Sequence, residues 1–521
     1  MATGADGVLG RRAELAQIVR NAVSAYGVRV LMALSVVLLT PFLYRRLGAG
    51  GFGTWSVVYT ISTVFLLVET GFSRGVSKLT AELLAARDRE RLSSTIGASV
   101  GIFACLGVVA LVISVVLGVF APGLASASAR HAFELGMFVV GIERLVYAPL
   151  GAYSAALPGY QRYDLHNIGN AVNVFVFTAG TIAVVEAGGG VFAVVVVFAV
   201  AHLLMGIIGA VFLKLTDPAV PLRPRFGDTA TLRGLTRFSS YVLLAESMTF
   251  IGQRMDTLVI AAIRNAAAAG TYSAVLKLQT GLQSLTLPVL YQLMPMASDL
   301  AARGRRHEVL RRLRLATRVT LQVTLPVAAA LALFASDIVH LWLGQDAPDV
   351  AEGILVVLMI VQVILLTAAA AEQVLVGIGR VRAIGLLAFL EGTSNVSISV
   401  ALVWRYGAVG AAIGTLVTSG VLAPVKIPIV CRALGSSTGA FVRGSVVPAV
   451  ASSAPALAAM ALVRVFVSEG PARLVLGASV GMLLALVVAG RQLGPRRVVT
   501  MLRQVAAGRR ETAAAAGSWE A

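Results

Sequence analysis

Charged side chains lie inside long apolar stretches of this sequence, where an unpaired charge is costly. Five basic residues are the candidates for chemistry there: Arg29, Arg74, Arg144, Arg254 and Lys277. Each costs about 2.5–3.5 kcal/mol at the centre of a bilayer unless it is paired or hydrated. Arginine and lysine bind phosphate oxygens well. The three deepest, Arg144, Arg254 and Lys277, predict a hydrated cationic cavity that binds an anionic ligand.

The other basic positions leave alternatives open. Arg29 and Arg74 lie nearer the ends of their stretches, so snorkelling to the membrane surface explains them as well as a cavity does. Lys426 and Arg464 lie close to helix ends, and for them we expect snorkelling. For any of the deep charges, a structural bridge between helices is the alternative to a ligand-binding role.

Acidic residues accompany the cations, and we expect them to line the cavity or to bind a coupling ion: Glu69, Glu143, Glu246 and Asp256. Glu143 adjoins Arg144, and Asp256 follows Arg254 by two positions. Neighbours at these spacings do not face each other on a helix. We therefore expect their partners on other helices or in water. The five histidines show no ligand spacing, and we predict no metal site.

The elements that must position these charges are transmembrane helices. Of 521 residues, 58% are hydrophobic and 13% are charged, about half the charged share of a soluble protein. The net charge is +18, but the basic residues lie in short gaps between apolar runs. Nucleic acid is therefore not the predicted partner. The runs are continuously apolar rather than alternating, which favours helices over a membrane barrel.

Fourteen runs have roughly the 20 residues that a membrane span needs. Their ranges are 22–44, 52–77, 95–120, 132–157, 167–186, 190–213, 238–262, 268–294, 316–341, 350–376, 383–404, 408–431, 446–466 and 472–490. The N-terminus, the even-numbered loops and the tail together contain 30 Lys and Arg residues, against six in the odd-numbered loops. By the positive-inside rule, both termini are cytoplasmic. The predicted protein is multi-pass and all-α.

Two short stretches of the sequence occur twice, and this repetition predicts a duplicated architecture. GTWS at 53–56 returns as GTYS at 270–273, and LAARDR at 84–89 returns as LAARGR at 300–305. Six spans separate the copies, so both have the same orientation, as in parallel repeats. We expect Trp55 to anchor a tight external turn at the membrane interface.

The predicted organisation has two parallel six-helix lobes followed by two further helices. Its segments are a cytoplasmic N-terminal segment (1–21), an N-lobe (22–213), a cytoplasmic linker (214–237), a C-lobe (238–431), helices 13 and 14 (446–490) and a cytoplasmic tail (491–521).

Residues 43–89, with their L-G-x-x-x-F-G-x-W stretch, resemble the opening of bacterial polysaccharide-export flippases. These belong to the multidrug/oligosaccharidyl-lipid/polysaccharide exporter superfamily. Residues 255–300 are similar to the second-half counterpart of that opening. The matching positions there are Asp256, Gly270, Tyr272, Lys277, Leu278, Pro295 and Ser298.

The resemblance implies two six-helix lobes facing each other in a V around a cationic cavity. It implies a flippase that moves a polyprenyl-diphosphate-linked oligosaccharide from the inner to the outer leaflet of the bacterial plasma membrane by alternating access. It implies no bound cofactor, although Na⁺ or H⁺ is a candidate coupling ion. The expected partners are that substrate, membrane lipid, and a polysaccharide polymerase or ligase.

Three alternatives remain. An ion-coupled multidrug exporter of the same superfamily would favour an acidic, aromatic cavity over a cationic one. A lipid II-type flippase shares the predicted number of helices. A membrane glycosyltransferase or ligase is less favoured, because the sequence has no long external loop with catalytic acids. We therefore expect a transporter and not an enzyme. The sequence also lacks a Walker A stretch, so no ATP-driven step is predicted.

Overall fold

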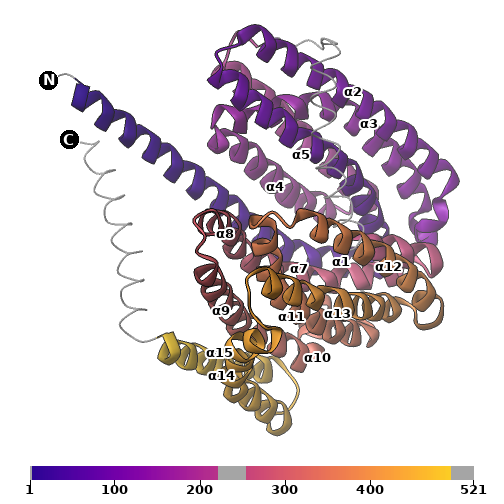
Figure 1. Cartoon of the computed structure of the whole chain (residues 1–521). Coiled ribbons are helices and arrows are strands. Elements are labelled where there is room, and N and C mark those ends of the chain that lie inside the picture. Colours follow the sequence, from indigo (N-terminus) through magenta and orange to yellow (C-terminus); the bar gives the residue numbers. More distant parts are fainter. Residues whose placement is uncertain (1–2, 221–253, 494–521) are drawn as a thin grey trace, which may run out of the picture. The chain divides into compact units, whose positions relative to one another are not determined.

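The computed structural model describes residues 3–220 and 254–493, and these residues form helices joined by short connections, with no strand among them (Figure 1). The prediction of an all-α membrane protein is confirmed. The predicted acid Glu246 and the predicted tail beyond residue 493 lie outside the described residues, as do parts of the predicted linker and seventh span.

The first helix is the longest. The α1 helix covers Thr3–Ala85, and its candidate membrane-spanning part runs from Val23 to Ala85. A break at Gly48 divides it, where φ is 69° and ψ is 169°. Glycine adopts this left-handed φ without a Cβ clash. The predicted spans 22–44 and 52–77 are therefore two helices that meet at Gly48 within α1.

The later helices follow the predicted runs. They are α2 (Arg89–Phe120), α3 (Arg130–Ala156), α4 (Tyr163–Glu186), α5 (Val191–Thr216), α7 (Ala266–Tyr291), α8 (Leu293–Ala302), α9 (Arg306–Leu333), α10 (Ala335–Leu343), α11 (Val350–Gly377), α12 (Val381–Tyr406), α13 (Ala408–Ala433), α14 (Thr438–Phe466) and α15 (Pro471–Leu493). Short 3₁₀ turns cover Pro122–Leu124, Ala127–Ala129 and Leu157–Tyr160.

Membrane spanning follows from helix length and from apolar side chains that remain exposed. Within the described residues, 11 helices are long and apolar enough to cross a bilayer. On α2, Val108, Val112 and Val116 form an exposed apolar stripe with exposures of 49%, 55% and 46%. Such a stripe is stable against lipid but not against water. The predicted number of fourteen spans stays a prediction.

The described helices divide into two compact units. Unit 1 comprises residues 1–278, 342–354 and 385–418. In it, α3 packs against both α2 and α5, and α1 packs against α3 and α4. A core of buried side chains that includes Ile96, Phe103 and Leu157 joins the ends of these helices. Burial of each large apolar side chain of this kind stabilises the folded state by roughly 1.5–3 kcal/mol.

Unit 2 comprises residues 279–341, 355–384 and 419–521. Its core includes Leu313, Val374 and Phe441, which lie on α9, α11 and α14. Helices α9 and α14 run parallel. Nε2 of Gln322 donates to Oγ of Ser452 at 2.9 Å, and further along both helices Arg464 donates to the carbonyl of Leu333. The bounds predicted for the two repeat lobes stay a prediction.

Candidate functional site

A cavity of about 450 Å³ lies inside unit 1. Its wall is built by α1, α3, α4, α5 and the first turns of α7, with one residue of α2. The volume falls within the range typical of small-molecule sites. Polar groups on the wall are Ser35, Thr40, Ser56, Glu69, Thr70, Ser73, Ser154, His166, Asn170, Asn173, His202, Ser273 and Lys277.

An aromatic group forms another part of the wall. The indole of Trp55 stacks on Phe177 with ring centroids 5.6 Å apart, and Phe198 meets it edge-on at 5.5 Å. Tyr59 lies 5.7 Å from the same indole. Trp55 is 6% exposed, so the expectation that it anchors the chain at the membrane interface is wrong. The kink at Gly48 turns the following residues of α1 toward the inside of unit 1, where the aromatic group packs.

Behind the cavity lies a buried charge cluster, here called the arginine cluster: Glu69, Glu143, Arg144 and His202. Arg144 is completely buried. Its Nε lies 2.6 Å from Oε2 of Glu143, and its Nη1 lies 3.5 Å from Oε1 of Glu69. Its Nη2 donates to Nδ1 of His202 at 2.6 Å. The guanidinium also covers the ring of Tyr147, at 4.8 Å from the centroid.

This cluster corrects one expectation and supports another. Glu143 and Arg144 are neighbours in sequence, and the expectation that they do not pair is wrong. The long arginine side chain lies along α3 and reaches both oxygens of the preceding carboxylate. The further partners do come from other helices, Glu69 from α1 and His202 from α5. His202 was not among the predicted site residues, and its only sequence signal is a lone polar residue within an apolar run.

Lys277 is the one predicted cation found among the residues lining the cavity in the described part of the chain. It lies on α7, and its Nζ lies over the ring of Tyr59, 4.9 Å from the centroid. An ammonium group at this position is attracted by the negative face of the aromatic ring. The cavity wall therefore carries one lysine, one glutamate and two histidines, which is a mixed rather than a purely cationic lining.

A second buried group, here called the carboxylate cluster, comprises Asp256, Tyr272, Asn395 and Thr415. Oδ2 of Asp256 lies 2.9 Å from both the Tyr272 hydroxyl and the Thr415 hydroxyl. Nδ2 of Asn395 donates to Thr415 at 3.0 Å. Asp256 is 3% exposed. Its second oxygen, Oδ1, has no hydrogen-bond partner among the described residues, and neither has Oδ1 of Asn395.

The two repeated glycines meet each other in unit 1. A Cβ added to Gly53 would lie 1.7 Å from the carbonyl oxygen of Ala266, and one added to Gly270 would lie 2.8 Å from Cα of Gly53. The Tyr44 hydroxyl lies 3.0 Å from that of Thr271 beside this crossing. The backbones of α1 and α7 approach closely because neither glycine carries a side chain. The GTWS and GTYS echo thus marks a helix crossing at the edge of the cavity.

The remaining predicted cations lie elsewhere. Arg29 and Arg74 are exposed on α1, and Arg254 is half-buried outside the cavity lining. Lys426 is 7% exposed and its Nζ lies 2.7 Å from Oε2 of Glu372, so the expectation of snorkelling is wrong for this residue. Arg464 reaches from α14 to the last carbonyl of α9, at 2.5 Å from the oxygen of Leu333.

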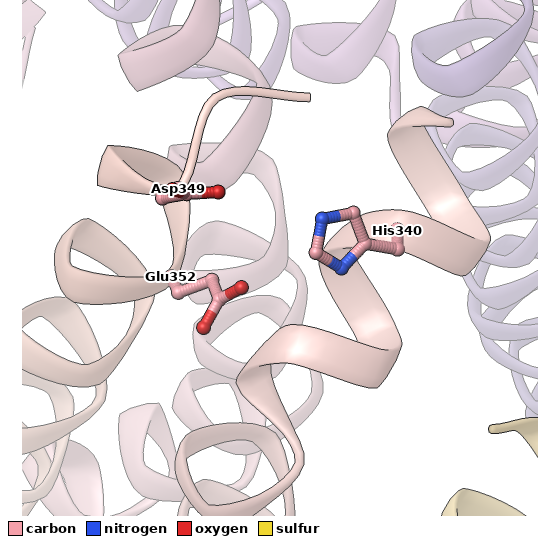
Figure 2. Close-up of side chains that lie close together, drawn as sticks. All are labelled: His340, Asp349 and Glu352. Atoms are coloured by element: carbon pink, nitrogen blue, oxygen red, sulfur yellow. The ribbon is translucent and has the colours of Figure 1, made fainter. Parts of the chain in front are cut away.

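Three side chains that could bind a metal lie on either side of the short connection between α10 and α11: His340, Asp349 and Glu352 (Figure 2). His340 belongs to unit 2, whereas Asp349 and Glu352 belong to unit 1. Asp349 is exposed and the other two are half-buried. Exposed acidic groups of this kind are common without an ion. The group supports no functional conclusion, and the expectation of no metal site stays a prediction.

The cavity as a whole can hold a polar, partly charged ligand by aromatic faces, amides and Lys277. Aromatic faces contribute large contact area, while the amide and hydroxyl groups orient a ligand by hydrogen bonds. Within the described residues, Arg144 is paired with two carboxylates of the protein although its Nη1 has no hydrogen-bond partner, and in the carboxylate cluster Oδ1 of Asp256 and Oδ1 of Asn395 have none either.

Comparison with known proteins places the chain in a family. The sequence profile of the family described as polysaccharide biosynthesis protein matches residues 43–352. No curated protein matches the sequence of the chain. A solved structure of the lipid II flippase MurJ, in an inward closed conformation, is similar with a TM-score of 0.73 at 12% sequence identity. It covers 92% of this chain and 99% of that one.

Two further solved structures share the fold. An inward-facing multidrug resistance transporter of the MATE family, in the MOP superfamily, has a TM-score of 0.67 and 15% identity, covering 80% of this chain and 98% of that one. A MOP superfamily transporter from Pyrococcus furiosus, described by a binding pocket of reverse polarity, has a TM-score of 0.53 and 16% identity. It covers 80% of this chain and 95% of that one. At these identities the likeness shows the fold alone.

Proposed function

The chain belongs to the family described as polysaccharide biosynthesis protein, with the fold of the MOP exporter superfamily, and on that premise we propose that it is a flippase for a polyprenyl-diphosphate-linked oligosaccharide. The head group passes from the inner to the outer leaflet of the bacterial plasma membrane by alternating access. Both termini are cytoplasmic in this proposal, and a polysaccharide polymerase or ligase takes over the product.

The composition of the cavity wall carries this proposal. Trp55 and Tyr59 present aromatic faces, against which the apolar faces of sugar rings pack. Asn170 and Asn173 lie on one turn of α4 and can exchange hydrogen bonds with hydroxyl groups. The Lys277 ammonium supplies a charge for a phosphate oxygen. The cavity volume of about 450 Å³ suits part of a head group rather than a whole polymer.

Arg144 has a positioning role in this scheme rather than direct contact with substrate. The guanidinium is buried behind the cavity wall, and two carboxylates and a histidine surround it. Its interactions fix Glu69 and His202, which do line the cavity. The substrate-binding role predicted for Arg144 is thereby replaced by an indirect one, whereas Lys277 keeps the role predicted for it.

The carboxylate cluster is the proposed place for a coupling ion. A buried carboxylate oxygen without a donor is costly, since the unmet desolvation amounts to about 1–3 kcal/mol or more for a charged group. Asp256 Oδ1 and Asn395 Oδ1 are both in this state among the described residues. Oxygen atoms are the ligands that hard cations prefer. Na⁺ or H⁺, as the co-transported ion, would bind at Asp256 and gain about 2.3 kcal/mol per charge per 100 mV of membrane potential.

The decisive experiment reconstitutes the full chain in proteoliposomes with labelled lipid-linked sugars and measures the label reaching the outer leaflet. We expect translocation with the unaltered chain and a loss of at least about tenfold with Lys277→Met. Lys78→Met is the matched control, because Lys78 lies exposed on α1 and pairs with Glu82 across one helical turn. Equal rates for both variants, or no translocation of any lipid-linked sugar, would contradict the proposal.

A multidrug exporter is the second candidate, and the aromatic wall with Glu69 favours it. An organic cation would pack against the cavity-facing sides of Trp55 and Tyr59 and be attracted to the Glu69 carboxylate. The same proteoliposomes loaded with a fluorescent organic cation distinguish the two. Export of the dye that is abolished by Glu69→Gln but unaffected by Lys277→Met would favour the exporter. A lipid II-type substrate is distinguished by including lipid II among the labelled lipids.

A further inference from the structure

A basic pocket of about 250 Å³ lies in unit 2, on the first three turns of α9. It is lined by His307, Leu310, Arg311, Arg314, Leu315, Arg318 and Gly444. The three arginines and the histidine fall within a sector of about 60° on the helix, because their spacing follows its 3.6-residue period. Gly444 of α14 closes the pocket, and a Cβ added there would lie 3.5 Å from Cδ of Arg314.

The pocket concentrates positive charge without an acidic group in its lining. The nearest acid along α9 is Glu308, which pairs with Arg305 and lies 3.8 Å from Nε2 of His307. Arg314 donates from Nη2 to Oγ of Ser436 at 3.1 Å. Its Nε is buried and has no hydrogen-bond partner among the described residues. A buried guanidinium nitrogen of this kind is satisfied by an anion that enters the pocket.

An apolar stripe continues from the arginines along α9. Leu315, Val319 and Val323 follow one another at single-turn spacing and are 53%, 37% and 54% exposed. The arginines therefore lie where α9 changes from a charged to a membrane-type sequence. Acyl chains can pack along this stripe while a head group reaches the pocket, as at basic pockets between transmembrane helices.

We propose that this pocket binds the phosphate of an anionic glycerophospholipid from the leaflet that the Lys and Arg distribution predicts to be cytoplasmic. Arg311, Arg314 and Arg318 bind the phosphate oxygens, and the acyl chains lie over Leu315, Val319 and Val323. A lipid is favoured over a free anion because the charged pocket and the exposed apolar stripe adjoin on one helix. This inference concerns unit 2 alone and is independent of the transported substrate.

The test measures lipid binding to the purified full chain in a neutral detergent, by native mass spectrometry with phosphatidylglycerol and phosphatidylcholine. We expect phosphatidylglycerol to bind and phosphatidylcholine not to. Each pocket arginine that contacts the phosphate is expected to contribute about a fivefold factor in affinity. Arg311→Gln should therefore weaken binding about fivefold, and Arg311→Gln with Arg318→Gln about 30-fold. Size-exclusion chromatography checks that the variants fold.

Arg312→Gln is the matched control, because Arg312 is exposed on the same turn but outside the pocket. For this variant we expect the lipid affinity to change by less than about twofold, against about fivefold for a pocket arginine. That difference supports a defined pocket. An equal loss for Arg312→Gln would overturn the proposal, because it indicates only diffuse surface attraction. Equal binding of phosphatidylcholine would overturn it as well. Displacement of the lipid by millimolar inorganic phosphate would also overturn the proposal, because it indicates that the pocket binds a free anion rather than a lipid.

Discussion

The arginine cluster and the carboxylate cluster are both buried in unit 1, yet they resolve the cost of a buried charge in opposite ways. Arg144 is surrounded by two carboxylates and an imidazole, all supplied by the protein. Asp256 is surrounded by neutral hydroxyl and amide groups, and no cation of the described chain lies within salt-bridge distance of it. Arg144 is thus paired with charges of the protein and Asp256 is not, although Nη1 of Arg144 and Oδ1 of Asp256 are both buried without a hydrogen-bond partner among the described residues.

The two clusters also use their tyrosines differently. Tyr147 presents its ring face to the Arg144 guanidinium, whereas Tyr272 directs its hydroxyl at Asp256. Of the two tyrosines, only Tyr272 lies in one of the repeated stretches, GTYS. Its counterpart Trp55 has no hydroxyl and packs in the aromatic wall of the cavity. The two similar sequences GTWS and GTYS therefore place different chemistry at their third position.

The largest effect is expected from Arg144→Met, which leaves Glu69 and Glu143 buried without their common cation. Breaking a buried ion pair on one side costs about 3–5 kcal/mol. We expect a sharp fall in the amount of folded protein in the membrane and in the thermal unfolding midpoint. The same substitution combined with Glu69→Gln and Glu143→Gln should recover most of the loss. A stable single variant would show that the cluster is not charge-compensated as described.

The next effect concerns the helix crossing between the clusters. Gly53→Ala introduces a Cβ 1.7 Å from a backbone oxygen of α7, so the two helices must separate. Overpacking of this kind costs about 1–3 kcal/mol. We expect lower thermal stability together with reduced transport. Gly123→Ala is the control, because nothing lies within 4 Å of a Cβ at that position. Similar behaviour of both variants would exclude a role for the crossing.

A third prediction separates the clusters by their response to ions. If Na⁺ is the coupling ion, a concentration of 100 times its Kd stabilises the folded chain by about 2.7 kcal/mol. We expect this stabilisation, measured as the shift of the unfolding midpoint between K⁺ and Na⁺ buffers, to vanish in Asp256→Asn. Glu69→Gln should retain it. Loss of the Na⁺ effect only in Glu69→Gln would place the ion in the arginine cluster instead.

The smallest effects come from the two tyrosines. Tyr272→Phe removes one hydrogen bond to a carboxylate and should cost about 1.5 kcal/mol. Tyr147→Phe keeps the ring that covers Arg144, so its effect on stability should stay below about 0.5 kcal/mol, since cation–π attraction needs only the ring. Chemical-denaturation midpoints of the two variants, measured side by side in one detergent, provide the check. A reversed order would mean that the hydroxyl of Tyr147 has the structural role.

Apolar runs and the spacing of polar residues were enough to predict the helices. The ranges of α2, α3, α5, α11, α12 and α13 lie within a few residues of the predicted runs, except for the earlier start of α2. The backbone must satisfy its hydrogen bonds locally in lipid, so a long apolar run becomes a helix whatever its neighbours are. The direct junction of the first two helices at Gly48 was not predictable from the apolar runs, because the backbone conformation of one residue decides it.

The sequence by itself determined that this protein is an all-helical membrane protein with buried charges, because composition and run length decide how a chain meets lipid. Lys277 and Glu69 were predicted for the cavity on this basis, and both line it. Only the tertiary structure decided that Glu143 pairs with Arg144, that His202 joins them, and that Trp55 faces inward. These are contacts between side chains on different helices, or along a flexible arginine, and the helical period alone does not specify them.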